Sequence, residues 1–164
     1  MGVESDLDIA RAWYLKAADQ GDSKAQLELG LIHERGDGTP KNYPLAVEWF
    51  TKAAEAGHPK ARMKLGNLYR DGRGVPQDDT KAAHWIIKAA NQGENSAQIA
   101  ASVLYREGVG VPKDYVESYM WAAIAANRGA IFAHAFVRAI ELKMSAVEIE
   151  EARARVEAWS PKVL

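Results

Sequence analysis

The sequence predicts an all-α fold: a right-handed α-α superhelix, or solenoid, of about four 36-residue helix-turn-helix repeats plus a C-terminal capping helix. Three observations predict it. Residues recur at one fixed interval, the segments between short Gly- and Pro-containing stretches have helical periodicity, and runs of β-branched residues are rare. Such a period is typical of solenoids, in which each repeat packs on its neighbours. No strand is expected. The repeats are expected at about 6–35, 42–71, 78–107 and 114–143, and the capping helix and tail at 144–164.

Equivalent positions of the repeats lie 36 residues apart and carry the same residue types. These signature positions are Trp13, Trp49, Trp85 and Trp121 in the repeats, and Gly36, Gly72, Gly108, Pro40, Pro76 and Pro112 between them. We expect the tryptophans to pack in the core, because RNA-stacking platforms would vary between repeats and be surrounded by positive charge. The regular lysines Lys16, Lys52 and Lys88 are expected to be solvated or to snorkel.

Each repeat contains two predicted helices, and the second repeat illustrates them. The first helix is expected at about 44–56, because its apolar residues have the i, i+3, i+4, i+7 spacing of one buried face. Gly57 ends this helix, and the second is expected at about 59–70. A small residue at Gly66 would let neighbouring helices approach closely, and Ser102 keeps the equivalent position of the third repeat small.

The stretches GDGTP, GRGVP and GVGVP between the repeats resemble the beginning of a nucleotide site. A phosphate loop would need a Lys-Ser/Thr pair, a preceding strand and a downstream acidic residue, which are missing. A connector explains the pattern better: Gly72 caps one helix, Pro76 prevents its continuation, and Asp78 caps the start of the next. The equivalents of Asp78 are Asp6, Asn42 and Asp114, and Glu117 is expected to form a capping box with Asp114.

The segments AVEWFTKAAEAG, ARMKLGNLY and DGRGVPQD resemble the Sel1-like repeat family, a relative of the tetratricopeptide repeat, and the resemblance covers essentially the whole chain. It implies an α-solenoid that serves as a non-catalytic scaffold or adaptor and binds a protein or peptide partner. Some cysteine-rich members have been linked to cell-wall peptides, but this chain has no cysteine, so nothing carries over. A cell-wall (peptidoglycan)-related hydrolase or binding protein and an RNA-binding solenoid are the alternatives.

The composition gives no support to catalysis, metal binding or nucleic-acid binding. The net charge is −1, whereas a nucleic-acid partner would favour a basic excess. None of the four histidines belongs to an HExxH motif, and no G-x-S-x-G occurs. His33 occupies the position of Tyr69 and Tyr105 and is expected to be a packing residue. No catalytic residue, cofactor or metal is therefore expected.

A partner-binding surface is expected where the repeats differ on one face of their first helices, which line the concave side of tetratricopeptide-like solenoids. The candidate positions, named here the first-helix stripe, are Glu48, Thr51, Glu55, His84, Ile87, Asn91 and Met120. Ile87 and Met120 are apolar where a solvent face would favour charge, which indicates either a ligand surface or a contact with a neighbouring helix.

The two ends of the sequence differ. Gly2 and Val3 are in register with a connector, which predicts either a segment of a longer array or an abrupt start on the first helix. At the other end, Ser145 and Glu148 predict a capping box, and Ile149, Ala152, Val156 and Trp159 are expected to face the last repeat. No run approaches the ~20 apolar residues of a membrane span, so no membrane insertion is expected in this segment. Without an upstream leader a cytoplasmic protein is expected, and with one removed a periplasmic or exported protein.

Overall fold

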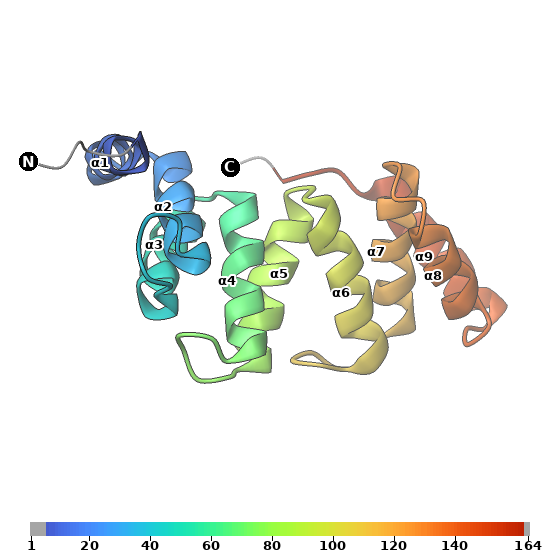
Figure 1. The fold of residues 1–164 in the computed structure, drawn as a ribbon. Coiled ribbons are helices and arrows are strands. Elements are labelled where there is room, and N and C mark those ends of the chain that lie inside the picture. The colour runs from blue at the N-terminus through green and yellow to red at the C-terminus, as the bar shows by residue number, and fades with distance from the viewer. Residues whose placement is uncertain (1–5, 163–164) are drawn as a thin grey trace, which may run out of the picture. The chain divides into compact units, whose positions relative to one another are not determined.

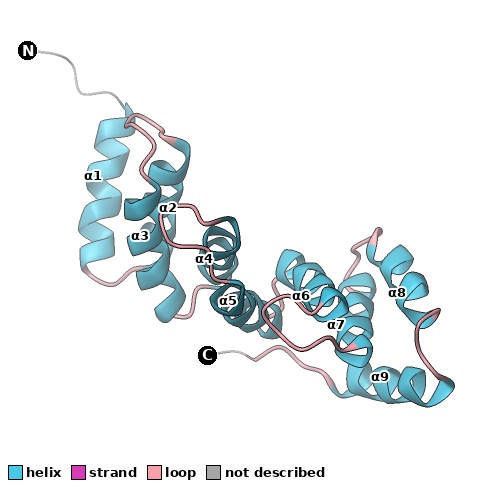
Figure 2. Cartoon of the chain, turned by 90° about the horizontal axis from the view of Figure 1, so that it is seen from below, coloured by secondary structure: helices cyan, strands magenta, loops and turns pink. Residues whose placement is uncertain are grey.

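The computed structural model describes residues 6–162, and every regular element in this range is an α-helix. The helices are α1 (Asp6–Asp19), α2 (Ser23–Arg35), α3 (Tyr43–Glu55), α4 (Pro59–Asp71), α5 (Asp79–Asn91), α6 (Asn95–Glu107), α7 (Tyr115–Asn127), α8 (Ala133–Glu141) and α9 (Ala146–Ala158). No strand occurs in the described range, which confirms the predicted all-α class (Figures 1 and 2). The positions of Gly2 and Val3, which suggested a connector, lie outside it.

The chain divides between Gln77 and Asp78 into two compact units, the first with α1–α4 and the second with α5–α9. The bounds of α3 and α4 agree with the predicted helices to within one residue. None of the helices in the described part is both long and apolar enough to span a bilayer.

In the first unit, each helix packs against the next one in the chain. Its core joins Trp49 of α3 to Ala18 of α1 and Leu29 of α2. The helices α2 and α3 approach closely at Gly30, where an added Cβ would lie 2.4 Å from a ring carbon of Phe50. A small residue at this repeat position, predicted from Gly66, therefore has a direct packing role in the first repeat.

In the second unit, α6 packs against α5 and α7, and both α8 and α9 pack against α7. The core here joins Tyr119 of α7 to Ile140 of α8 and Ala152 of α9, and Val156 packs against the same residues. The capping helix therefore covers the last repeat, as predicted, and it does so through the repeat's first helix.

The predicted helix ends are confirmed in detail. The second helices α2, α4 and α6 end at glycines with left-handed backbones, namely Gly36, Gly72 and Gly108. The next helix is preceded in each case by a residue whose side chain accepts a hydrogen bond from its first turn, namely Asn42, Asp78 and Asp114. The second glycine of each connector has a separate reason. At Gly110 (φ 69°) an added Cβ would lie 2.0 Å from the carbonyl oxygen of Asp79, so the connector can lie on the start of α5 only without a side chain.

Two capping predictions are wrong. Asp6 is already the first helical residue of α1 rather than its N-cap. The Asp114 side chain accepts from the backbone N–H of Glu117, but the Glu117 carboxylate does not complete a capping box. It forms an ion pair with Arg155 of α9 instead, because the capping helix brings a guanidinium within reach. The capping box of Ser145 and Glu148 does form.

A periodic contact that the sequence interpretation missed joins the two helices of three repeats. The side chains of Gln26, Arg62 and Gln98 donate to the carbonyl oxygens of Ala18, Ala54 and Ala90 at 3.2, 3.0 and 3.3 Å. We call this contact the helix-pair clasp. All three donors are buried, and burial lowers the pKa of Arg62. Their spacing of 36 residues was visible in the sequence, whereas the fourth repeat has the exposed His134 there.

The core assignment of the tryptophans is correct for Trp49 and Trp121, which are 8% and 2% exposed. Trp85 is half-buried, and Trp13 is 66% exposed, so the assignment is wrong for Trp13. Trp49 is buried by the helix pair that precedes it, and no described helix precedes α1. The positions of the regular lysines are more specific than predicted. The ammonium groups of Lys16, Lys52 and Lys88 lie over the rings of Trp13, Trp49 and Trp85, at 5.6, 4.1 and 5.1 Å from the ring centroids.

Candidate functional site

The first-helix stripe has a different character in each repeat. On α3, Glu48 and Glu55 are exposed and Thr51 is half-buried. On α7, Met120 is only 8% exposed, so it is a packing residue and is not available as a contact for a partner. Of the two interpretations left open by the sequence, contact with neighbouring helices therefore applies to Met120.

On α5 the stripe combines exposure with apolar character. His84 is exposed, and Ile87 and Asn91 are half-buried. The Asn91 amide donates to the Ile87 carbonyl oxygen at 2.9 Å, so its Nδ2 is used within the helix. Ile87 therefore presents part of its side chain to solvent between two polar residues.

Next to this face lies an open hollow of about 320 Å³, which we call the α5 hollow. Its lining consists of Thr80, His84, Ile87 and Lys88 from α5 and Gly110 and Val111 from the connector after α6. The close approach of Gly110 to the backbone of Asp79 holds the connector against α5. The structure thus joins the stripe to a connector loop, two features that the sequence interpretation treated separately.

The lining of the α5 hollow includes one lysine, Lys88, and no carboxylate. The ammonium group of Lys88 lies 5.1 Å from the Trp85 ring centroid, and the His84 ring meets the same indole edge to face at 5.3 Å. Trp85 therefore contacts both polar side chains that line the hollow with Ile87 and Val111. This arrangement suits an apolar side chain accompanied by a negative charge.

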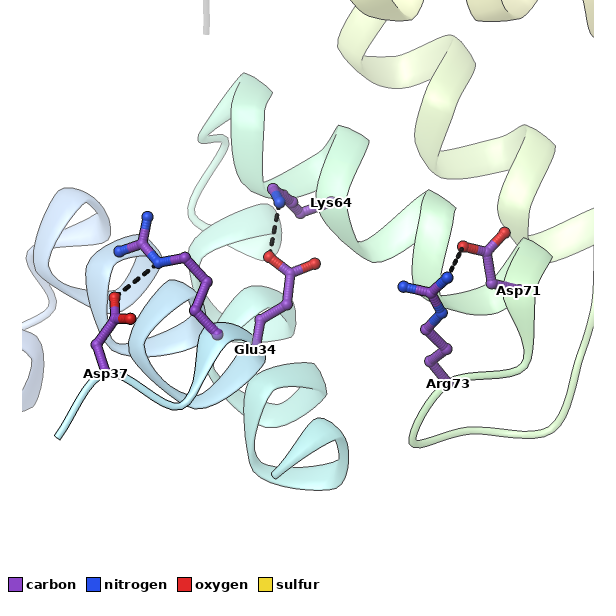
Figure 3. Close-up of polar contacts among 6 residues, drawn as sticks. Glu34, Asp37, Lys64, Asp71 and Arg73 are labelled. Atoms are coloured by element: carbon purple, nitrogen blue, oxygen red, sulfur yellow. Dashed lines mark hydrogen bonds and ion pairs between the residues drawn. The ribbon is translucent and has the colours of Figure 1, made fainter. Parts of the chain in front are cut away.

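Polar groups of the first unit form ion pairs rather than a reactive cluster (Figure 3). Lys64 of α4 binds Glu34 of α2 at 2.6 Å, whereas Arg73 of the following connector lies 3.6 Å from Asp71, the last residue of α4. His33 is half-buried, and burial lowers its pKa, assisted by the charge of Arg11, as fits the predicted packing role. Within residues 6–162 no group of three His, Asp or Glu residues could hold a metal ion.

Comparison with known families gives a match over most of the chain. The Sel1 repeat model matches residues 1–22, 23–58, 59–94 and 95–129. The last three segments start at 23, 59 and 95, which reproduces the 36-residue interval, although each begins on the second helix of a pair. No match was found among curated protein sequences.

Solved structures give the same result. A Sel1 repeat protein from Oxalobacter formigenes is 36% identical, with a TM-score of 0.78 over 97% of this chain and 68% of its own. The antigen c5321 of uropathogenic Escherichia coli is 28% identical, with a TM-score of 0.58 over 96% of this chain and 41% of its own. Helicobacter pylori cysteine rich protein B, 23% identical with a TM-score of 0.65, covers 82% of this chain and 96% of its own, and is similar in fold.

Proposed function

The chain belongs to the Sel1 repeat family, and from this premise we propose that it is a non-catalytic scaffold or adaptor that binds a peptide segment of a partner protein at the α5 hollow. The observation that carries the proposal is the α5 hollow itself. It combines the partly exposed Ile87 with Val111 and Lys88, an apolar surface beside a cation. Concave sites with few polar groups are the usual places where ligands bind.

The second and fourth repeats support the choice of α5 by contrast, whereas the first has the exposed Leu15 at the position of Ile87. At the position of Ile87, α3 has Thr51 between two exposed glutamates, which offers no apolar anchor. The equivalent region of α7 is closed by the burial of Met120. Among the described first helices of the second unit, α5 is therefore the one whose stripe is both apolar and open.

The lining indicates the chemistry of the partner. Burial of an apolar side chain against Ile87 and Val111 would supply most of the affinity, since a few central contacts usually dominate an interface. A carboxylate next to that side chain would pair with Lys88. We therefore expect a partner segment with an aliphatic or aromatic residue beside an aspartate or glutamate.

The test uses peptides selected on the full chain from a displayed random library. Replacing Ile87 with aspartate places a negative charge in the apolar part of the α5 hollow, so affinity for the selected peptides should fall at least tenfold, about 1.4 kcal/mol. The fold should lose little, within about 0.5 kcal/mol, because Ile87 is partly solvated already. Fluorescence anisotropy measures the first quantity and a thermal melt the second.

A matched control is Thr51→Asp, which introduces the same residue at the equivalent position of α3. It should leave peptide binding unchanged. If Ile87→Asp unfolds the chain, Ile87 belongs to the core and the proposed site is wrong. If both variants stay folded and bind the peptides like the original chain, the partner binds elsewhere.

A further inference from the structure

The last described residues contact α5 and α7, and one of their partners is Asn91 of the first-helix stripe. After α9 the chain leaves the helix with an extended backbone at Trp159 (φ −76°, ψ 135°). Residues 159–162, named here the tail, then run back past α7 and α6 towards the end of α5 (Figure 1). All of these elements belong to the second unit.

Two residues, Trp159 and Lys162, anchor the tail. The indole of Trp159 meets that of Trp121 edge to face, with 6.3 Å between the ring centroids, and the Arg128 guanidinium lies 6.0 Å from the Trp159 centroid. Three residues later the backbone N–H of Lys162 donates to the carbonyl oxygen of Asn91 at 2.8 Å. Asn91 is the last residue of α5, so its carbonyl has no partner within the helix and is open to a ligand.

The receiving surface is held in place by residues outside the tail. Arg128 donates to Asn95 Oδ1 at 2.9 Å and to the carbonyl oxygen of Gly93 at 3.2 Å. These bonds fix the guanidinium across the turn between α5 and α6. Trp121, Arg128 and the Asn91 carbonyl, which receive the tail, therefore all belong to α5–α7 and their turns.

The tail does not satisfy this surface completely. The indole nitrogens of Trp121 and Trp159 are both buried, and neither has a hydrogen-bond partner among the described residues. Trp121 is only 2% exposed, so its N–H depends on an acceptor from a neighbouring group. A peptide that placed a carbonyl or carboxylate oxygen there would make a bond that the tail leaves unmade.

We propose that the end of α5, Trp121 of α7 and the turn after α7 form a binding site for an extended peptide with an aromatic side chain, and that the tail fills this site as a displaceable internal ligand. The partner presents the aromatic ring between Trp121 and Arg128, an acceptor oxygen beside the indole, and a backbone N–H three residues later for Asn91. The site lies at the opposite end of α5 from Thr80 and does not depend on the α5 hollow.

The test supplies the tail in trans. The probe is a fluorescein-labelled peptide of residues 158–164, AWSPKVL, titrated by anisotropy into three chains: the full chain, Trp159→Ala, and a chain that ends at Ala158. The shortened chain and Trp159→Ala should bind the probe, and the full chain at least tenfold more weakly, because its own tail competes at a high effective concentration.

Matched peptides separate the two anchors. Lys162→Pro in the probe removes the backbone N–H that binds Asn91, whereas Lys162→Ala keeps it, so only the former should weaken binding several-fold. Arg128→Ala in the shortened chain should weaken binding of the original probe by a similar factor. Equal effects of both Lys162 changes would contradict the hydrogen bond to Asn91.

Circular dichroism decides between a displaceable ligand and a structural strap. The Trp159→Ala variant and the chain that ends at Ala158 should both keep their helical signal. If both lose it, the tail is part of the fold and the proposal fails. The proposal also fails if the variants stay folded and bind the probe no better than the full chain does.

Discussion

The helix pair α2–α3 and its counterpart α6–α7 have the same place in the repeat pattern of their units but pack through different residues. Between α2 and α3, Gly30 leaves room for the ring of Phe50, which is completely buried. Seventy-two residues later the same positions carry Ser102 and Ala122, two small side chains in place of a glycine and a phenylalanine. The combined volume of the two side chains is therefore smaller in the second unit, and the chemistry of the contact changes as well.

The second pair also replaces part of the apolar contact by a polar one. The hydroxyls of Ser102 and Ser118 lie 3.2 Å apart, and Ser118 Oγ donates to the Ser102 carbonyl oxygen at 2.8 Å. Phe136 of α8 packs against the core cluster that contains Ala122. The small side chain of Ala122 is thus accompanied by a serine contact and by Phe136 from another helix. Repeats with the same 36-residue interval therefore need not pack through the same contacts.

The largest expected effect comes from Phe50→Ala, which empties the space over Gly30 and should lower the free energy of unfolding by about 3–5 kcal/mol. Gly30→Ser alone should cost about 1–3 kcal/mol, because its Cβ would collide with the ring. The double variant reproduces the residues of the second unit and should cost at least about 1 kcal/mol less than the sum. Urea unfolding followed by circular dichroism measures all three, and strict additivity would refute the compensation.

A smaller effect is expected from Ser118→Ala. The substitution removes the donor to the Ser102 carbonyl and the partner of the Ser102 hydroxyl in a fully buried contact. We expect a loss of about 1–2 kcal/mol, typical of buried groups left without a partner. In the Ser118→Ala variant, amide hydrogen exchange should accelerate more in α6 and α7 than in α2 and α3. A neutral substitution would mean that the serine pair has no role in stability.

The smallest expected effect concerns the caps, since Asn42 caps α3 and Asp78 caps α5. Hydrogen bonding from the backbone N–H of Lys81 lowers the pKa of Asp78 below its ordinary value of 3.8. Because the folded pKa is depressed, the stabilisation is present above 3.8 and is lost as the pH falls through the folded pKa. Asp78→Asn keeps the cap and should remove this contribution to acid sensitivity. Melts from pH 6 to about 2 would show a flatter profile for Asp78→Asn, and an unchanged profile would exclude the carboxylate as a source.

Most of the fold could be predicted because it follows from local signals that repeat. Helix ends at Gly72 and Asp78 depend on backbone geometry within a few residues, and the 36-residue interval fixes which residues are equivalent. The exposure of Trp13 and the burial of Met120 could not be predicted in the same way. Equivalent residues have the same neighbours only in the interior of an array, and these two lie in the first and last repeats.

The candidate site depended still more on contacts distant in sequence. Ile87 is half-buried on α5, and Val111 lies beside it only because the connector packs on α5. The ion pair of Glu117 with Arg155 and the bond from Lys162 to Asn91 both come from the capping segment, which lies outside the repeat pattern. A non-repeating segment has no equivalent copies from which its contacts could be inferred.

The helix-pair clasp has a mechanical consequence. In each pair that has this clasp, a buried side chain of the second helix donates a hydrogen bond to a backbone carbonyl oxygen near the end of the first. A change of the angle between the two helices therefore requires this buried hydrogen bond to break. Helix pairs with the helix-pair clasp should therefore be stiff. Bending of the chain should be concentrated in the connectors that follow them. The fourth pair has no clasp, and its second helix, α8, is only nine residues long. Under tension, the described chain should yield first at that pair.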